Sequence, residues 1–421
     1  MQIHDSQIFN FKEKAIHWAN QFDICCILDS NQYTDPYSKF DFIVAAGTKA
    51  TLSQNETLHA FEELKKFRLQ YQGWIFGGLA YDLKNEIEPL TSQHQDGIQF
   101  PDLFFFAPQF LLILKGGHLE IIGAEEEFIW KQINQVNPRK ESFHFEKPVI
   151  KSRFSKTEYL KTVHQIKEEI ALGNIYETNF CMEFYAEDAE IHPLDTYLKL
   201  NQLSPTPFSN YFKWFDKYIL SATPERFLSK RGQKLISQPI KGTAKRSGNL
   251  DEDEQIKREL VNHPKEKQEN VMIVDLVRND LTKSAKKGSV KVEELFGVYS
   301  FKQVHQMIST VVCELNEDIH PIDAIKNTFP MGSMTGAPKI KAMQLMEHYE
   351  RTKRGIYSGA VGYFSPDDDF DFNVIIRTIL YHSTKKYLSF QVGSAITFYA
   401  DAEKEYEECL LKVKAILEVL S

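Results

Sequence analysis

The C-terminal part of the chain constrains the fold more than any other segment. Three runs rich in apolar and β-branched residues, 355–364, 373–381 and 387–397, follow one another with only short polar turns between them. Short turns join antiparallel strands, because a parallel pair needs a long crossover connection. A long amphipathic helix over 402–420 then closes the chain. This order predicts an α+β fold in which antiparallel sheet carries helices on its outer side.

The length of 421 residues allows two or three average domains or one large layered domain. The first third reads as mixed strands and helices, and the pattern becomes denser after a polar stretch at 137–142. We therefore divide the chain into an N-terminal region, 1–145, and a C-terminal region, 146–421. The two are expected to interleave in one globule.

Charge and hydropathy exclude several classes of function. The 50 Lys and Arg against 58 Asp and Glu give a net charge of −8, which argues against nucleic acid as a partner. The N-terminal residues contain no apolar signal core, and the most hydrophobic stretch, 104–114, is short and broken by Pro108. The five cysteines have no CxxC spacing and are expected to be reduced core thiols. These features predict a cytoplasmic protein without membrane association.

A single lysine in the middle of the chain is the strongest indication of chemistry. Lys241 lies between the rigid Pro239 and the permissive Gly242, directly after an apolar stretch at 235–236. A backbone fixed on both sides favours a lysine that points into a pocket, and a buried lysine can become a nucleophile. A surface turn with an ordinary lysine is the other interpretation of this segment by itself.

The C-terminal helix carries a pair of acids beside its apolar stripe. At about 100° per residue, Glu405, Glu408 and Lys412 fall together on the edge of the stripe and not on the opposite, solvent side. Two carboxylates one turn apart repel each other unless a cation lies between them. A solvated acidic shoulder is the alternative for this helix alone.

A second pair of acids occurs on the helix expected to begin at Pro264. Glu266 and Glu269 share the direction of the apolar residues that follow them. Burying unpaired carboxylates costs several kcal/mol. Two such pairs on two inward faces therefore predict a hard divalent cation with oxygen ligands, Mg²⁺ above all.

Three further segments are candidates for substrate contacts. The small-residue loop 332–337 precedes Pro338, a suitable first helical residue, so its free amides could bind an anion, although a tight turn is the alternative. Arg377, within the apolar run 374–380, requires an anionic partner. This partner is either the carboxylate or phosphate of a ligand or an acidic side chain in a structural ion pair. Glu225 precedes Lys241 by 16 residues, so a hairpin could place an acid beside the lysine.

Taken in order, these segments resemble the chorismate-utilising enzymes, which include anthranilate synthase component I, aminodeoxychorismate synthase component I, isochorismate synthases and salicylate synthases. The similarity is strong from about Ser152 to the C-terminus, and 28–30 echoes the more divergent N-terminal region of the family. The matching motifs are G-N-I-Y-E-T-N at 173–179, T-P-E-R-F at 223–227, P-I-K-G-T at 239–243, E-N-V-M-I-V-D-L-V-R-N-D at 269–280, G-A-P-K at 336–339 and E-Y-E-E at 405–408. The resemblance implies two large, mainly antiparallel sheets packed as a sandwich with helices outside.

Two positions point to one branch of this family. Isochorismate and salicylate synthases resemble one another in having a water-activating lysine where Glu177 stands, and many other members have glutamine there. Anthranilate synthases typically have alanine in the position of Lys241, whereas aminodeoxychorismate synthases with a covalent intermediate have lysine. The resemblance therefore implies conversion of chorismate and ammonia to 4-amino-4-deoxychorismate, within para-aminobenzoate and folate biosynthesis.

The same resemblance assigns roles to individual residues. Lys241 would add at C2 of chorismate while Glu225 protonates the departing C4 hydroxyl, and ammonia would then add at C4 and expel the lysine. Mg²⁺ on the ring carboxylate would be held by Glu269 and Glu408, with Glu266 and Glu405 behind them. The implied substrate-binding residues are Thr243, His305, Thr335, Gly336, Ala337, Tyr357, Arg377, Gly393 and Lys412, with His305 lining the ring.

The resemblance also implies partners. No glutaminase motif occurs in the chain, so ammonia would come from a separate glutamine amidotransferase subunit. Ser30, Pro207 and Phe208 resemble the region where relatives hold tryptophan. Two alternatives remain open: an anthranilate synthase component I that has lysine at 241, and a non-catalytic sensor of chorismate or an amino acid.

Overall fold

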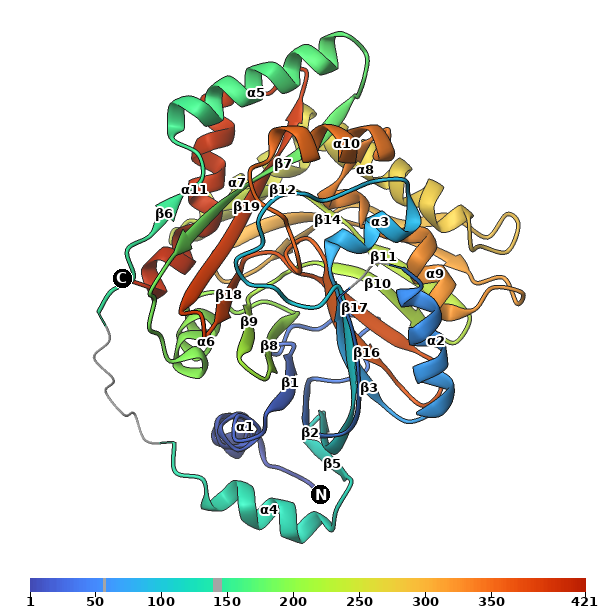
Figure 1. Ribbon diagram of the computed structural model, residues 1–421, viewed down its shortest axis with the longest axis vertical. Helices are drawn as coiled ribbons and strands as arrows, with labels where there is room; N and C mark the ends of the chain where they lie inside the picture. The colour runs from blue at the N-terminus through green and yellow to red at the C-terminus, as the bar shows by residue number, and fades with distance from the viewer. Residues whose placement is uncertain (56–57, 139–145) are drawn as a thin grey trace.

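A computed structural model describes residues 1–55, 58–138 and 146–421 (Figure 1). Most of the expected connection at 137–142, and the proposed boundary at 145, lie outside these residues, so the division into two regions stays a prediction. Every ladder between the described strands is antiparallel, which confirms the predicted fold class.

The strands form two runs in space. One run has the order β6(Lys151–Ser152), β7(Glu177–Ala186), β19(Tyr387–Thr397), β18(Thr378–His382), β9(Lys217–Ser221), β8(Ser209–Trp214), β1(Ile24–Asp29) and β2(Phe42–Gln54), with β15(Gly336–Ala337) also on β7. The other has the order β5(His118–Ile122), β4(Leu103–Lys115), β3(Ile75–Leu79), β16(Ala360–Phe364), β17(Phe370–Val374), β10(Arg226–Arg231), β11(Lys234–Gln238), β14(Val304–Glu314) and β13(Lys291–Ser300), with β12(Ile240–Lys245) also on β14.

The two runs are continuous through the long β2–β4 pair. This pair extends from Phe42↔Leu114 to Gln54↔Leu103 and shifts register between Thr48 and Ala50. The resemblance implied two large, mainly antiparallel sheets packed as a sandwich, and the β2–β4 ladder also joins the described strands into one 19-stranded sheet. A sequence pattern shows which residues are extended but not which strands share a partner, so the join could not be predicted.

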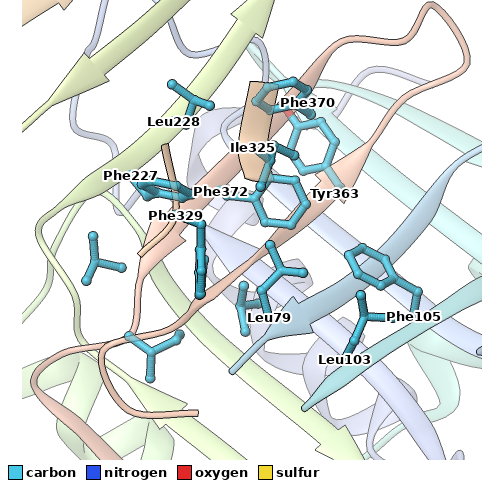
Figure 2. Close-up of a cluster of buried hydrophobic side chains, with 14 of the residues drawn as sticks. Leu79, Leu103, Phe105, Phe227, Leu228, Ile325, Phe329, Tyr363, Phe370 and Phe372 are labelled. Carbon is cyan, nitrogen blue, oxygen red and sulfur yellow. The ribbon is translucent and has the colours of Figure 1, made fainter. Parts of the chain in front are cut away.

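Two hydrophobic cores lie on opposite faces of this sheet. In β2, Ile43 and Ala45 belong to one core, and the alternate residues Phe42 and Val44 belong to the other. Figure 2 shows part of the first core, where Phe227 of β10 packs against Phe329 beside Phe370 and Phe372 of β17. This aromatic packing fixes the start of β10, which carries Glu225 immediately before it.

Helices cover the sheet on both sides. Helices with residues in the second core are α1(Asp5–Ala19), α4(Glu126–Gln135), α5(Lys156–Ala171), α6(Pro193–Leu203), α10(Lys339–Tyr349) and α11(Ala402–Val419). Those with residues in the first core are α2(Ala60–Gln70), α8(Pro264–Thr282), α9(Pro321–Thr328), η1(Tyr81–Leu83) and η2(Gly332–Met334). The remaining described helices are α3(Lys84–Ile87) and α7(Leu250–Asn262). In Figure 1, α5 and α11 lie beside β7 and β19, and α2 and α9 lie together on the other side.

Local signals account for the helices that matter to the site. α5 begins with a capping box between Ser155 and Glu158, and α8 has Pro264 in its first turn, as the sequence indicated. Asp401 caps α11 by accepting a hydrogen bond from the Lys404 amide. These caps fix where the two glutamate-bearing helices start, and therefore which way their acids face.

The run 373–381 is not one strand. β17 ends at Val374 and β18 begins at Thr378, and Arg377 between them has a left-handed φ of 50°. The C-terminal part therefore contains four strands, β16 to β19, where three were expected. Apolar residues continue on both sides of the break, so hydrophobicity alone does not reveal it.

Candidate active site

A large cavity of about 710 Å³ lies among β12, α8, α11 and the ends of β7 and β19. Cavities of this size hold small organic ligands. Its lining includes the following residues singled out by the sequence: Glu225, Lys241, Thr243, Glu266, Glu269, Tyr357, Arg377, Gly393, Glu405, Glu408 and Lys412. The structure thus brings together residues that are up to 187 positions apart in the chain (412 − 225 = 187).

Lys241 enters the cavity from β12, where the ladder to β14 shifts register between Ile240 and Thr243. Gly242 has a φ of 95°, and a Cβ atom there would lie 3.1 Å from Glu266 Oε2. This glycine therefore lets β12 pass close to α8. Lys241 is half-buried and makes no hydrogen bond or ion pair with any described side chain. Its amine is free to meet a ligand.

Glu225 faces the same cavity from the residue before β10. The β10–β11 hairpin places Arg226 opposite Gln238, which brings Glu225 close to the start of β12. Glu225 is buried, and burial raises the pKa of its carboxyl to about 7, although Ser333, Lys241 and Arg377 oppose the rise. A carboxyl with this pKa can hold a proton near neutral pH and donate it.

Four glutamates gather at one end of the cavity. Glu266 and Glu269 come from α8, and Glu405 and Glu408 come from α11. Burial, together with the neighbouring Glu269, raises the pKa of Glu266. Burial and Glu408 likewise raise the pKa of Glu405. Burial also opposes ionisation of Glu408, but the Lys412 ammonium 2.6 Å away keeps the pKa of Glu408 below its ordinary value.

The donor set of this cluster fits a hard cation. All four side chains offer carboxylate oxygens, and Glu269 Oε1 is buried without a hydrogen-bond partner in the described part of the chain. Lys265 lies among them, with Nζ 3.1 Å from Glu405 Oε1 and 3.5 Å from Glu269 Oε1. Within residues 1–55, 58–138 and 146–421, no three acid, His or Cys side chains already converge as a metal cage. The magnesium assignment therefore stays a prediction.

Cationic and polar groups line the cavity beside these acids. Arg377 has no ion pair with a described residue, and burial lowers the pKa of its guanidinium despite Glu225 and Glu408. Lys412 donates a hydrogen bond to the Gly393 carbonyl at 2.9 Å, and buried Tyr357 lies on the same wall. An unpaired guanidinium beside a cavity is suited to a carboxylate ligand. The cavity thus offers a nucleophile, an acid, an acidic cluster and an anion site.

Comparison with known proteins identifies the family. Residues 20–418 match the family model described as chorismate binding enzyme. The chain belongs to this family. Aminodeoxychorismate synthase of Streptomyces griseus is 40% identical over 273 residues, which cover 64% of this chain and 37% of that protein. The chain therefore spans much less than two thirds of that relative.

Other members of the family match over nearly the whole chain. Aminodeoxychorismate synthase component 1 of Escherichia coli (strain K12) is 30% identical over 94% of this chain and 92% of that protein. Further relatives are named anthranilate synthase component 1. The crystal structure of anthranilate synthase component I from Streptococcus pneumoniae TIGR4 has a TM-score of 0.78 at 24% identity, over 92% of this chain and 93% of that chain. The shared fold confirms the predicted chorismate-binding architecture.

His305 was expected to line the substrate ring, but its side chain does not line the cavity. Its ring contacts Asp253 Oδ1 at 3.0 Å and Ser300 Oγ at 2.8 Å, away from the cavity. Val304 and Gln306 on either side line the cavity instead. Alternate residues of a strand face opposite sides of the sheet. A shift of one position therefore separates a residue that lines the cavity from one that packs on the other side. His305 holds β14 against α7.

The loop 335–337 also does not line the cavity. Gly336 and Ala337 pair with β7, and a Cβ atom on Gly336 would lie 2.3 Å from the Glu177 carbonyl oxygen. The glycine therefore serves close backbone packing, and Thr335 Oγ1 donates to the Gly332 carbonyl. Ser333 and Met334, just before it, line the cavity. Pro338 caps α10 and is not its first helical residue.

Several cavity residues were missed at the sequence level. Asn179, Arg246 and Lys265 line the cavity, yet none was singled out as a site residue. A usable signal existed for Lys265, because it precedes Glu269 by four positions on a helix, the spacing of an ion pair. Asn179 follows Glu177 by two positions on a strand, which places the two on one face.

A second, smaller cavity of about 60 Å³ lies apart from the first. It brings together Ser30, Pro207 and Phe208, the three residues that resemble a tryptophan site in relatives. Whether this chain holds an amino acid there stays a prediction. Among the described helices, none is both long and apolar enough to cross a bilayer.

Proposed function

We propose that this chain is the chorismate-binding component of an aminodeoxychorismate synthase, which converts chorismate and ammonia to 4-amino-4-deoxychorismate. The position of Lys241 carries the proposal: its amine is unpaired and faces a large cavity that also contains Glu225. A lysine amine with an acid close by suits a covalent route, because one group attacks while the other protonates the leaving group. The names of the Streptomyces griseus and Escherichia coli relatives support the same choice.

In this route the Lys241 amine forms a bond to C2 of chorismate. The ring double bond shifts, the C4–O bond breaks, and Glu225 gives its proton to the departing hydroxyl, which leaves as water. Ammonia then forms a bond to C4, and Lys241 departs from C2. The raised pKa of Glu225, about 7, supports its role as the acid, because the carboxyl still holds a proton near neutral pH.

The acidic and basic side chains of the cavity would orient the substrate. Glu269 and Glu408, with Glu266 and Glu405 behind them, would hold Mg²⁺, and that ion would neutralise the ring carboxylate. Arg377 and Lys412 would bind the enolpyruvyl carboxylate. Contacts to both carboxylates would hold the doubly charged substrate in one orientation. Ammonia would come from a partner glutamine amidotransferase subunit, which fits the designation component 1 of the relatives. We expect the reaction to take place in the cytoplasm.

Product analysis tests this function. The purified chain is incubated with chorismate, MgCl₂ and an ammonium salt, and half of each sample then receives an aminodeoxychorismate lyase. We expect para-aminobenzoate only in the samples with the lyase. Anthranilate formed without the lyase would instead identify an anthranilate synthase component I, the alternative that further relatives favour. Tight binding of chorismate without turnover would identify a sensor.

Replacement of Lys241 tests the covalent route. We expect Lys241→Ala to reduce product formation by at least about 100-fold and to leave the melting temperature nearly unchanged, because a half-buried lysine without partners adds little stability. Intact-mass analysis of wild-type protein quenched with chorismate should show an adduct that the variant lacks. Full activity of Lys241→Ala would exclude the covalent intermediate.

A further inference from the structure

The covalent route requires a proton acceptor for Lys241. At neutral pH an ordinary lysine is an ammonium group, whose nitrogen has no lone pair for attack. Three carboxylates feel the charge of Lys241: Glu177 of β7, Glu225 before β10 and Glu408 of α11. The question is which of them removes the proton.

Two of the three are committed to other tasks. Glu408 is paired with Lys412 at 2.6 Å and belongs to the acidic cluster. Glu225 is the group that must keep its own proton for the departing hydroxyl, so it cannot also take one from the lysine at the same step. This leaves Glu177.

Glu177 has the structural properties of a free acceptor. Its side chain is 3% exposed, and Oε2 is buried without a hydrogen-bond partner in the part of the chain that the structure describes. It lies two residues before Asn179 on β7 and therefore on the same strand face as this cavity-lining residue. Backbone pairing of β7 with Thr397 of β19 and Ala337 of β15 holds this position from both sides. A buried oxygen left unpaired in this way costs stability, which suggests a functional reason for it.

The charges around Glu177 favour proton transfer. Lys241 is the cation that acts on it, and Glu269 of α8 is the other charged neighbour with an effect. Burial raises the pKa of Glu177, and Glu269 adds to the rise. When a ligand expels water from the cavity, a neutral acid beside a neutral amine is favoured over a buried ion pair. The proton can therefore move from the ammonium to the carboxylate.

We propose that Glu177 accepts the proton of the Lys241 ammonium and so generates the amine that attacks the substrate. This inference rests on the proposed function. The proton leaves Lys241 Nζ for a carboxylate oxygen of Glu177, and the free electron pair then forms the N–C2 bond while Glu225 protonates the leaving oxygen. After ammonia has bonded to C4, the new ammonium returns a proton to Glu225. Lys241 departs as an amine and regains its proton from Glu177, so the cycle closes.

The test is the rate at which the Lys241 adduct forms, followed by quenched-flow intact-mass analysis from about pH 6 to about pH 10. In Glu177→Gln the amide keeps the shape but accepts no proton. We expect adduct formation to be about 10- to 100-fold slower than wild type near pH 7 and to approach the wild-type rate toward pH 10, where hydroxide can take the proton in place of Glu177. Glu177→Leu, of similar size, should behave in the same way.

Control measurements separate the possible outcomes. Glu187→Gln, at an exposed position just after β7, should form the adduct at the wild-type rate. Thermal unfolding should show that Glu177→Gln is folded, because it removes a buried charge that has no hydrogen-bond partner at Oε2. A wild-type rate near pH 7, or a loss of equal size at every pH, would overturn the role of Glu177 as acceptor. Absence of any adduct in the wild type would overturn the covalent route itself.

Discussion

Glu225 shows how one buried side chain can couple stability to catalysis. Its pKa lies at about 7 because burial disfavours the carboxylate, whereas the unfolded chain has an ordinary glutamate near pH 4.5. Between these two pH values the folded protein binds more protons than the unfolded chain, so the free energy of unfolding falls as pH rises. Above about pH 7 the folded state must hold a buried charge.

Glu225→Gln should reveal both effects. The variant cannot donate the proton, so we expect turnover to fall by roughly 100-fold or more. Its stability relative to wild type should rise by on the order of 3 kcal/mol between about pH 4.5 and pH 8, since 1 unit of pKa corresponds to about 1.4 kcal/mol. Urea unfolding of both proteins over this range measures the difference. A constant difference across the range would contradict the raised pKa.

At the scale of elements, α8 and α11 each carry two glutamates and bring all four together in the cavity. Lys265 of α8 partly neutralises the cluster by reaching across to Glu405 of α11 at 3.1 Å. An ion held by Glu269 and Glu408, with Glu405 behind them, would need the space beside the Glu269 and Glu405 oxygens that the Lys265 ammonium approaches. The lysine and a divalent cation should therefore compete.

Lys265→Met tests this competition without reference to turnover. We expect the variant to bind Mg²⁺ at least about tenfold more tightly, measured by calorimetry without substrate, because a competing positive charge is removed. Without metal it should be less stable than wild type, since four acids then face one another with less compensation. Lys267→Met, two positions along α8 with Nζ over the Phe296 ring, is the matched control and should bind Mg²⁺ as wild type does. Equal or weaker affinity in Lys265→Met would refute the competition.

At the scale of the whole molecule, the N-terminal and C-terminal regions share one sheet. β1 pairs with β8, and β3 pairs with β16, so strands from before residue 145 lie between strands from after it. The first core likewise contains side chains from both regions, including Phe105 and Phe372 with ring centroids 6.2 Å apart. Neither region retains a complete core by itself.

We therefore expect a single cooperative unfolding transition. Scanning calorimetry should give one peak whose calorimetric enthalpy equals the van't Hoff enthalpy, because the two regions cannot lose structure separately. The chain is long for such behaviour, which makes the result informative. Two resolved peaks would show that the boundary near residue 145 separates independently stable domains.

The sequence by itself determined features that depend on local periodicity and capping. The starts of α8 and α11 and the inward direction of Glu269 and Glu405 follow from the position of proline and from helical spacing, which need no knowledge of a partner. The fixed backbone around Lys241 also follows from its immediate neighbours, Pro239 and Gly242. The family motifs also carried the fold class and the charged residues Glu225, Lys241, Glu269, Glu405 and Glu408 that line the cavity.

Only the tertiary structure decided which face of each extended segment meets the cavity. His305 and Gln306 differ by one position, and a single step along a strand reverses the side chain, so the sequence could not choose between them. Gly336 looked like part of an anion site because small residues serve both ligands and close packing, and it proved to pack on β7. The join of β2 with β4, the reach of Lys265 to α11 and the unpaired oxygen of Glu177 each depend on elements distant in the chain. Contacts of this kind are not encoded in any local window.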